Sequence, residues 1–193
     1  RRLHLCDHNL ETIETKSTAK HDLLAEVCMA AKYEGESINT HYTKHKLTNR
    51  DTKSQLCTVL ARSFADIGDI VRGRDIFRGN DEEKKKRDQL ESKLKEIFGK
   101  IHGGLSTKKG AEARYKDTDN YYELREDWWT ENRHTVWEAL TCEAPESAHY
   151  FRPTCGGGKT PTQGKCRCDN VSIVPTYFDY VPQYLRWFDE WAE

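Results

Sequence analysis

The chain has 193 residues, a length that suits one domain or two small subdomains that share a core. Its 31 basic and 32 acidic side chains give a net charge of -1, which argues against a nucleic-acid-binding protein because phosphate binding usually needs a basic excess. No apolar run reaches the roughly 18 residues of a membrane-spanning helix, and the first residues lack the apolar stretch of a signal peptide.

The spacing of apolar residues predicts five helices, two of them in the N-terminal half. The first begins after Ser17 or Thr18, which are good caps, and ends at Gly35. The second runs from about Asp51 to Val71, with a break or kink at Gly68. Their apolar stripes are Leu23, Leu24, Val27, Cys28 and Ala31 in the first helix, and Leu56, Val59, Leu60, Phe64, Ile67 and Val71 in the second.

Three more helices follow along the chain. The third begins at Asn80 with an acidic first turn, which suits the helix dipole, and ends at the Gly103-Gly104 pair. The fourth runs from about Asn120 to Thr141, and its tandem tryptophans, Trp128 and Trp129, indicate a helix covered on more than one side. The fifth runs from Val181 to the end of the chain. Their apolar positions are Leu90, Leu94, Ile97, Phe98 and Ile101, then Tyr121, Leu124, Val136, Trp137 and Leu140, then Leu185, Phe188 and Trp191.

The segment from Pro145 to Val174 is rich in Gly, Pro, Thr, Lys and Cys, which predicts a loop. It has no strand-like alternation, so the predicted fold class is all-α, disulfide-stapled, with long ordered loops. Four cysteines lie in or beside this loop: Cys142, Cys155, Cys166 and Cys168. Zinc sites favour C-x2-C pairs. The only close pair here is a C-x-C, whose two thiols point apart, so two disulfides are favoured over zinc.

The remaining cysteines leave two interpretations open. Cys28 and Cys57 are either buried thiols or the two halves of a bond that joins the first two helices. The predicted disulfide cysteines are then Cys28, Cys57, Cys142, Cys155, Cys166 and Cys168. With seven cysteines in all, Cys6 is left over, and we expect its partner outside the chain. The last helix has no glycine C-cap, which also predicts a fragment whose export signal and membrane anchor lie elsewhere.

A run of basic residues is the candidate ligand site. It comprises Arg72, Arg74, Arg78, Lys84, Lys85, Lys86, Arg87, Lys93, Lys95, Lys100, Lys108 and Lys109. One interpretation is a solvated helix face, and the other is a basic strip for sulfated or sialylated glycans. The glycine run from Gly156 to Thr160 lacks the phosphate-loop pattern, and no metal or nucleophile motif is present. We therefore expect no catalysis, no metal and no cofactor.

Several long segments resemble one family closely. These are Ala61 to Gly73, with the sequence ARSFADIGDIVRG, and Asp179 to Glu193, with DYVPQYLRWFDEWAE. Shorter matches are Leu3 to Cys6, Leu23 to Cys28, and Arg125 to Trp129. Together they resemble the alpha type of the Duffy-binding-like domain in malaria-parasite erythrocyte membrane protein 1, the variant surface adhesins.

The resemblance implies a helical, disulfide-bonded ectodomain on the outer face of the infected erythrocyte. Residues 1–193 would be a partial domain, namely the end of subdomain one and most of subdomain two, with subdomain three missing. The implied function is host cell-surface receptor binding, of the rosetting or endothelial type, through sulfated or blood-group glycans or glycoproteins. Host antibodies are further expected partners, and antigenic variation is a family role.

Two other hypotheses compete with an adhesion module. The domain could be a structural and antigenic spacer that has no ligand of its own. It could also be an intracellular zinc-binding or catalytic helical protein. A measurement showing that six thiols have been lost to disulfides would exclude this hypothesis.

Overall fold

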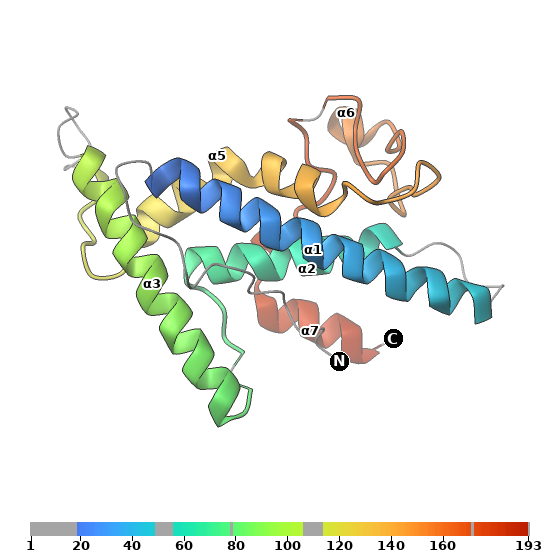
Figure 1. The fold of residues 1–193 in the computed structure, drawn as a ribbon. Helices are drawn as coiled ribbons and strands as arrows, with labels where there is room; N and C mark the ends of the chain where they lie inside the picture. Colours follow the sequence, from blue (N-terminus) through green and yellow to red (C-terminus); the bar gives the residue numbers. More distant parts are fainter. Residues whose placement is uncertain (1–18, 49–55, 78, 106–113, 171, 193) are drawn as a thin grey trace.

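The structure is a computed structural model that describes residues 19–48, 56–77, 79–105, 114–170 and 172–192, and in these ranges it forms helices and loops but no strand. The long helices are α1 (Ala19–Thr48), α2 (Leu56–Arg72), α3 (Asp81–Leu105) and α5 (Tyr122–Leu140). Three short elements follow, α6 (Cys155–Gly158), the 3-10 helix η1 (Phe178–Tyr180) and α7 (Gln183–Ala192) (Figure 1). The predicted all-α fold class is confirmed.

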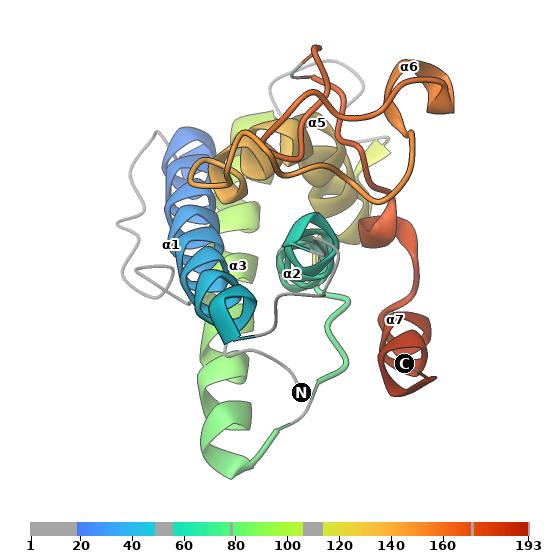
Figure 2. The ribbon, with the colours of Figure 1, turned by 90° about the vertical axis from the view of Figure 1, so that its right-hand side faces the viewer.

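Helix α2 lies at the centre of the molecule. Figure 2 looks along it and shows α1, α5 and the η1–α7 segment around it, in agreement with the contacts between these elements. Phe64 of α2 packs against two tryptophans of α5, with ring centroids 5.1 Å from Trp129 and 5.2 Å from Trp137. Both indoles are buried, and so is Trp128, whose ring centroid lies 6.2 Å from that of Phe98 of α3. The tandem tryptophans Trp128 and Trp129 are therefore covered by two different helices, as predicted.

Two glycines that were expected to interrupt helices instead let helices approach one another. Helix α1 does not end at Gly35 but continues to Thr48, and a Cβ at Gly35 would lie 1.9 Å from the Leu140 oxygen of α5. Helix α2 continues through Gly68, where a Cβ would lie 2.8 Å from the Trp129 indole. Both predictions of a helix end or break were therefore wrong, because close packing, not backbone bending, requires glycine at these positions.

Helix α3 stands across one end of the other helices and contacts α1 and α5 (Figure 1). It buries Leu90, Leu94, Ile97, Phe98 and Ile101, which is the predicted seam. The helix continues past the Gly103-Gly104 pair to Leu105, so the predicted end lies less than one turn before the observed end.

Two disulfides hold the long loop after α5. Cys57 of α2 bonds Cys166, which lies 109 residues later, and Cys155 bonds Cys168. The predicted disulfides of Cys28 and Cys142 were wrong, because both are free thiols. Cys57 is buried on the side of α2 that faces the loop, so the bond joins α2 to the loop and not to α1. Cys6 lies outside the described residues.

A buried cluster of ion pairs fastens the C-terminal segment to α2 and α5. Arg186 of α7 pairs with Asp66 and Asp69 of α2, and Arg133 of α5 pairs with Asp179 of η1 at 2.7 Å. Burial raises the pKa of Asp69, and this effect outweighs the lowering by Arg186. The cluster ties residues more than a hundred positions apart to one another.

Candidate adhesion surface

The start of α3 is fixed by a reciprocal cap. The Glu83 N–H donates to Asn80 Oδ1 and the Asn80 N–H donates to Glu83 Oε2, each at 2.9 Å. This capping box satisfies two backbone donors that the helix leaves unpaired. It fixes the first turn of α3, and the apolar seam from Leu90 to Ile101 packs this helix on the core.

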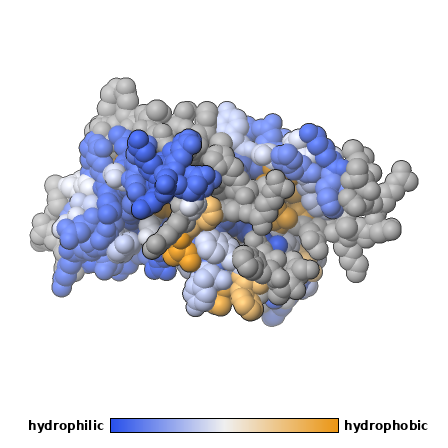
Figure 3. All heavy atoms as spheres, turned by 90° about the horizontal axis from the view of Figure 1, so that it is seen from below, coloured by the Kyte–Doolittle hydropathy of each residue, from blue (hydrophilic) through white to orange (hydrophobic). Residues whose placement is uncertain are grey.

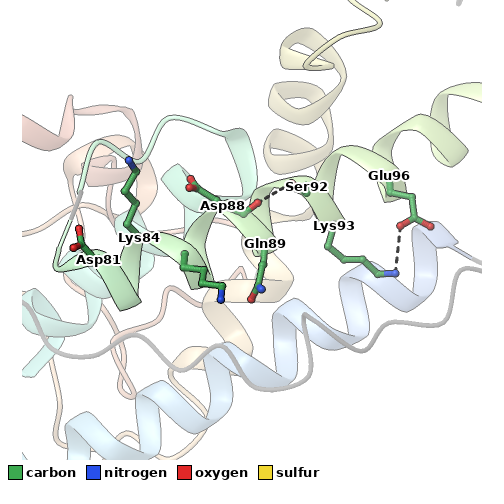
Figure 4. A pocket seen from close by; sticks show the side chains of 8 residues that line it. Asp81, Lys84, Asp88, Gln89, Ser92, Lys93 and Glu96 are labelled. Carbon is green, nitrogen blue, oxygen red and sulfur yellow. Dashed lines mark hydrogen bonds and ion pairs between the residues drawn. The ribbon is translucent and has the colours of Figure 1, made fainter.

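The outward side of α3 carries an open hollow of about 820 Å³. Figure 4 shows the lining side chains along α3: Lys84 and Asp88 project toward one edge of the helix, Gln89 and Lys93 project toward the other, and Lys93 turns toward Glu96. The described residues that line it are Asp81, Lys84, Lys85, Asp88, Gln89, Ser92, Lys93 and Glu96. We call this row the outer face of α3.

The lysines of α3 differ in the partners they have. Lys93 and Lys100 both pair with Glu96, at 3.4 and 3.0 Å, and they lower the pKa of Glu96, Lys100 more strongly. By contrast, Lys84 and Lys85 are exposed and have no ion pair among the described residues. These two ammonium groups are therefore the ones on the outer face that can bind an external anion.

A second groove, of about 590 Å³, lies between α3, the loop after α2 and the start of α5. Its lining is mixed: Ile70, Gly73, Asp75, Ile76, Phe77, Lys84, Arg87, Asp88, Leu90, Glu91, Leu94, Lys95, Asn120 and Tyr122. Ile76 and Tyr122 on this groove are 53% and 45% exposed. Sequence reasoning missed these two residues, because only the fold brings the loop beside the start of α5.

The structure removes Arg72 from the predicted ligand site. Its side chain is 1% exposed and donates to the Gly68 oxygen, to Asp69 Oδ1 and to the Asp179 oxygen. The guanidinium also lies 5.9 Å from the centre of the Trp129 ring. The prediction that Arg72 binds glycan was wrong, because it is a buried link between α2 and η1.

The other arginines of the predicted strip are engaged or fall outside the described part. Arg74 is 58% exposed but pairs with Glu126 at 2.6 Å, and Arg87 pairs with Asp75 and stacks 4.9 Å from the Phe77 ring centre. Lys86 lies 4.0 Å from Glu82. Arg78, Lys108 and Lys109 lie outside the described residues. Of the predicted basic strip, only a short row of lysines on α3 remains as a candidate among the described residues. Glycan binding by these lysines stays a prediction.

Within the described ranges, no three or more His, Cys, Asp or Glu side chains are arranged to hold a metal ion. Within the same ranges, no helix has the length and apolar character needed to cross a bilayer.

The fold and the surface define a class of protein. It is a helical domain with disulfide-bonded loops and with charged grooves at one end. Comparison with known families then identifies it, because a family model of the Duffy binding domain matches residues 1–186. The chain belongs to the Duffy binding domain family. No curated protein matches it.

Several solved structures resemble the chain closely. The NTS-DBL1-alpha and CIDR-gamma double domain of PfEMP1 from the Plasmodium falciparum varO strain is 46% identical with a TM-score of 0.80, and the match covers 98% of this chain and 26% of that one. The NTS-DBL1(alpha-1) domain of the same strain is 47% identical with a TM-score of 0.78 and coverages of 98% and 41%. An ICAM-1-binding PfEMP1 DBLbeta domain, IT4var13, is 33% identical with a TM-score of 0.71 and coverages of 98% and 41%.

These comparisons confirm the resemblance to the domains of erythrocyte membrane protein 1. Identity is higher to the two alpha structures than to the beta structure, as the motifs predicted. The chain spans between about a quarter and two fifths of the solved chains named above.

Proposed function

We propose that this domain binds a receptor on host cells while it is displayed on the extracellular face of an infected erythrocyte. The observation that carries the proposal is the likeness, over 98% of the chain, to a PfEMP1 domain described as ICAM-1-binding. ICAM-1 is the receptor named for that relative. The receptor that this chain binds depends on the side chains of its own surface. The proposal includes no catalytic activity and no cofactor.

The proposed contact is the outer face of α3, and the proposed ligand group is the sulfate or carboxylate of a host glycan. Lys84 and Lys85 support it, because they are exposed and unpaired among the described residues. An ammonium group forms a charge-assisted hydrogen bond with such an anion. A chain with a net charge of -1 can still carry a local positive site.

Heparin affinity tests the proposal, with the Lys84→Glu/Lys85→Glu variant beside a control. The variant should elute at a lower salt concentration than the unchanged chain, because two cations that release counterions are lost. Lys159→Glu is the control: this lysine is also exposed but lies after α6, at the opposite end of the molecule from α3 (Figure 1). Equal elution of the unchanged chain and the double variant would place the glycan site elsewhere.

One observation favours the second candidate, a structural and antigenic spacer. Helix α3 carries seven basic and six acidic side chains, so its charges nearly balance and several lysines are already paired within the helix. A spacer would fold, bind antibodies and show no ligand on an array of host receptors and glycans. Reproducible binding of the purified domain to one array member would exclude it.

A further inference from the structure

The groove beside α3, whose volume is about 590 Å³, has an apolar floor and two exposed apolar side chains on its rim. Leu90 and Leu94 of α3 line it and are buried, so they form the floor. Ile76 and Tyr122 stand on the rim, where they are 53% and 45% exposed. Figure 3 shows mainly hydrophilic residues at the end of the molecule where α3 lies, on the left in both Figure 1 and Figure 3. Apolar side chains that gather in a groove within such a surface mark a contact site.

The rim around Ile76 is fixed in place by bonds from two helices. The Ile76 N–H donates to Gln183 Oε1 of α7 at 2.8 Å, and Gln183 Nε2 donates to Asp75 Oδ1 at 2.7 Å. Arg87 of α3 also pairs with Asp75, and so ties the loop after α2 to α3. Figure 1 shows this loop running beside α3. A site held in this way binds a partner without first having to be ordered.

The wall on the side of α5 is fixed by a buried arginine. Arg125 is completely buried, and it donates to the two carboxylate oxygens of Glu91 of α3 at 2.7 and 2.9 Å. A bidentate pair of this kind fixes the relative orientation of the two side chains. Tyr122 lies one turn before Arg125, and its backbone N–H donates to Asp117 Oδ2 at 3.1 Å. The groove is therefore formed before any partner binds.

The same ion pairs decide the charge that the groove offers to a partner. The lining carries three basic and three acidic side chains, namely Lys84, Arg87, Lys95, Asp75, Asp88 and Glu91. Asp75 is paired with Arg87, and Glu91 is paired with Arg125, which is not part of the lining. The charges left are those of two lysines and one aspartate, so the groove has one excess positive charge. It complements a partner that carries a carboxylate.

We propose that the groove beside α3 binds a segment of a partner protein in which an apolar side chain lies next to an aspartate or a glutamate. The apolar side chain packs on the leucine floor between Ile76 and Tyr122, and the neighbouring carboxylate reaches Lys84. The aliphatic floor favours a protein over a glycan, because sugar hydroxyl groups placed on it would lose their hydrogen bonds to water. The inference does not depend on glycan binding at the outer face of α3, which the groove adjoins through Lys84 and Asp88.

Selection of short random peptides displayed on phage tests the inference, with the complete domain, expressed with the residues that flank this chain, as the bait. We expect the enriched peptides to share an apolar residue beside an aspartate or a glutamate. Ile76→Ser and Tyr122→Ser should each weaken binding of such a peptide by at least about tenfold. Both substitutions keep the backbone hydrogen bonds of these positions. Phe151→Ser is the matched control, because Phe151 is similarly exposed, at 59%, but lies on the disulfide-bonded loop.

A second measurement leaves the domain unchanged and varies the selected peptide. Replacing its apolar residue by serine should abolish binding, and replacing its acidic residue by the amide should weaken binding and reduce the dependence on salt. Enrichment of peptides without the apolar and acidic pair would overturn the inference. Equal binding of the selected peptide to the unchanged domain and to both the Ile76→Ser and Tyr122→Ser variants would also overturn it.

Two controls separate this groove from the proposed glycan site. Neither Ile76→Ser nor Tyr122→Ser removes a charge, so both variants should elute from heparin at the salt concentration of the unchanged domain. A failure of the glycan proposal therefore leaves the peptide result unaffected. If Tyr122→Ser instead abolished binding to a member of a glycan array while peptide binding persisted, the groove would be a sugar site and the inference would be wrong.

Discussion

Replacing Asp179 by alanine tests whether the buried ion pairs hold the C-terminal segment on the helices. The carboxylate of Asp179 is completely buried. It accepts hydrogen bonds from the Trp129 Nε1–H at 2.9 Å and from two Arg133 nitrogens, at 2.8 and 2.7 Å. The substitution Asp179→Ala therefore leaves one guanidinium and one indole N–H without their partner.

The expected loss of stability follows from the environment of these two groups. Removing one partner of a buried ion pair costs about 3–5 kcal/mol. Arg133 is 12% exposed and still donates to the Thr176 oxygen at 2.9 Å, which reduces the penalty toward the lower limit. We therefore expect a loss of about 3 kcal/mol, and a Tm lower by roughly 6–12 °C at this chain length.

Chemical denaturation followed by tryptophan fluorescence and circular dichroism measures this loss, with the disulfides kept oxidised. The matched control is Glu96→Ala, which breaks two exposed ion pairs with Lys93 and Lys100. Solvent screens exposed ion pairs, so the control should hardly change the denaturation midpoint. If Asp179→Ala were no more destabilising than Glu96→Ala, the cluster would not hold the segment.

Four further substitutions or treatments have defined outcomes. Gly35→Ala should destabilise the fold by more than about 2 kcal/mol in thermal unfolding, because its Cβ would lie 1.9 Å from an α5 backbone oxygen. Gly103→Ala, with open space around the new Cβ, should instead stabilise the fold by about 0.5–1 kcal/mol. Backbone N–H groups around the start of α5 lower the pKa of Asp117, so its stabilisation is fully present above the unfolded pKa and is lost as the pH falls through the lower, folded pKa. The Tm gap between the unchanged chain and Asp117→Asn should therefore narrow as the pH falls below about 4, and a constant gap would contradict this. Iodoacetamide at pH 8 should modify the exposed Cys142 faster than Cys28, because burial raises the pKa of Cys28 to about 11; peptide mass spectra showing equal rates for these two cysteines would refute this.

Helix positions could be predicted from the sequence where an apolar seam and a cap coincide. Helix α3 begins at Asp81 because Asn80 caps it, and both features can be read from neighbouring residues. The glycines could not be interpreted in the same way. Gly35 and Gly68 serve contacts with α5, which lies far along the chain, so their role appears only once the helices have packed.

Disulfide partners and grooves depend on the same long-range packing. Cys57 and Cys166 are 109 residues apart, and nothing in their spacing selects that bond over the other possible pairings. Of the groove beside α3, only the basic side chains could be proposed from sequence. Ile76 and Tyr122 join it because the loop after α2 and the start of α5 meet in space.

Arginine and lysine have different roles in this chain, and the difference bears on where a receptor can bind. Arg125 is completely buried and donates to the Val71 oxygen at 2.7 Å and the Ile70 oxygen at 3.2 Å, and so caps the last carbonyls of α2. Gly73 follows there with a φ of 70°, and a Cβ would lie 2.8 Å from the Arg125 guanidinium. Arg72 and Arg125 therefore belong to the scaffold, because the five donors of an arginine can satisfy buried carbonyls. Substituting either arginine would destabilise the domain, so a loss of the proposed receptor binding in such a variant would not locate the site. A binding site is better located by substituting the exposed lysines of α3, whose loss leaves the scaffold intact.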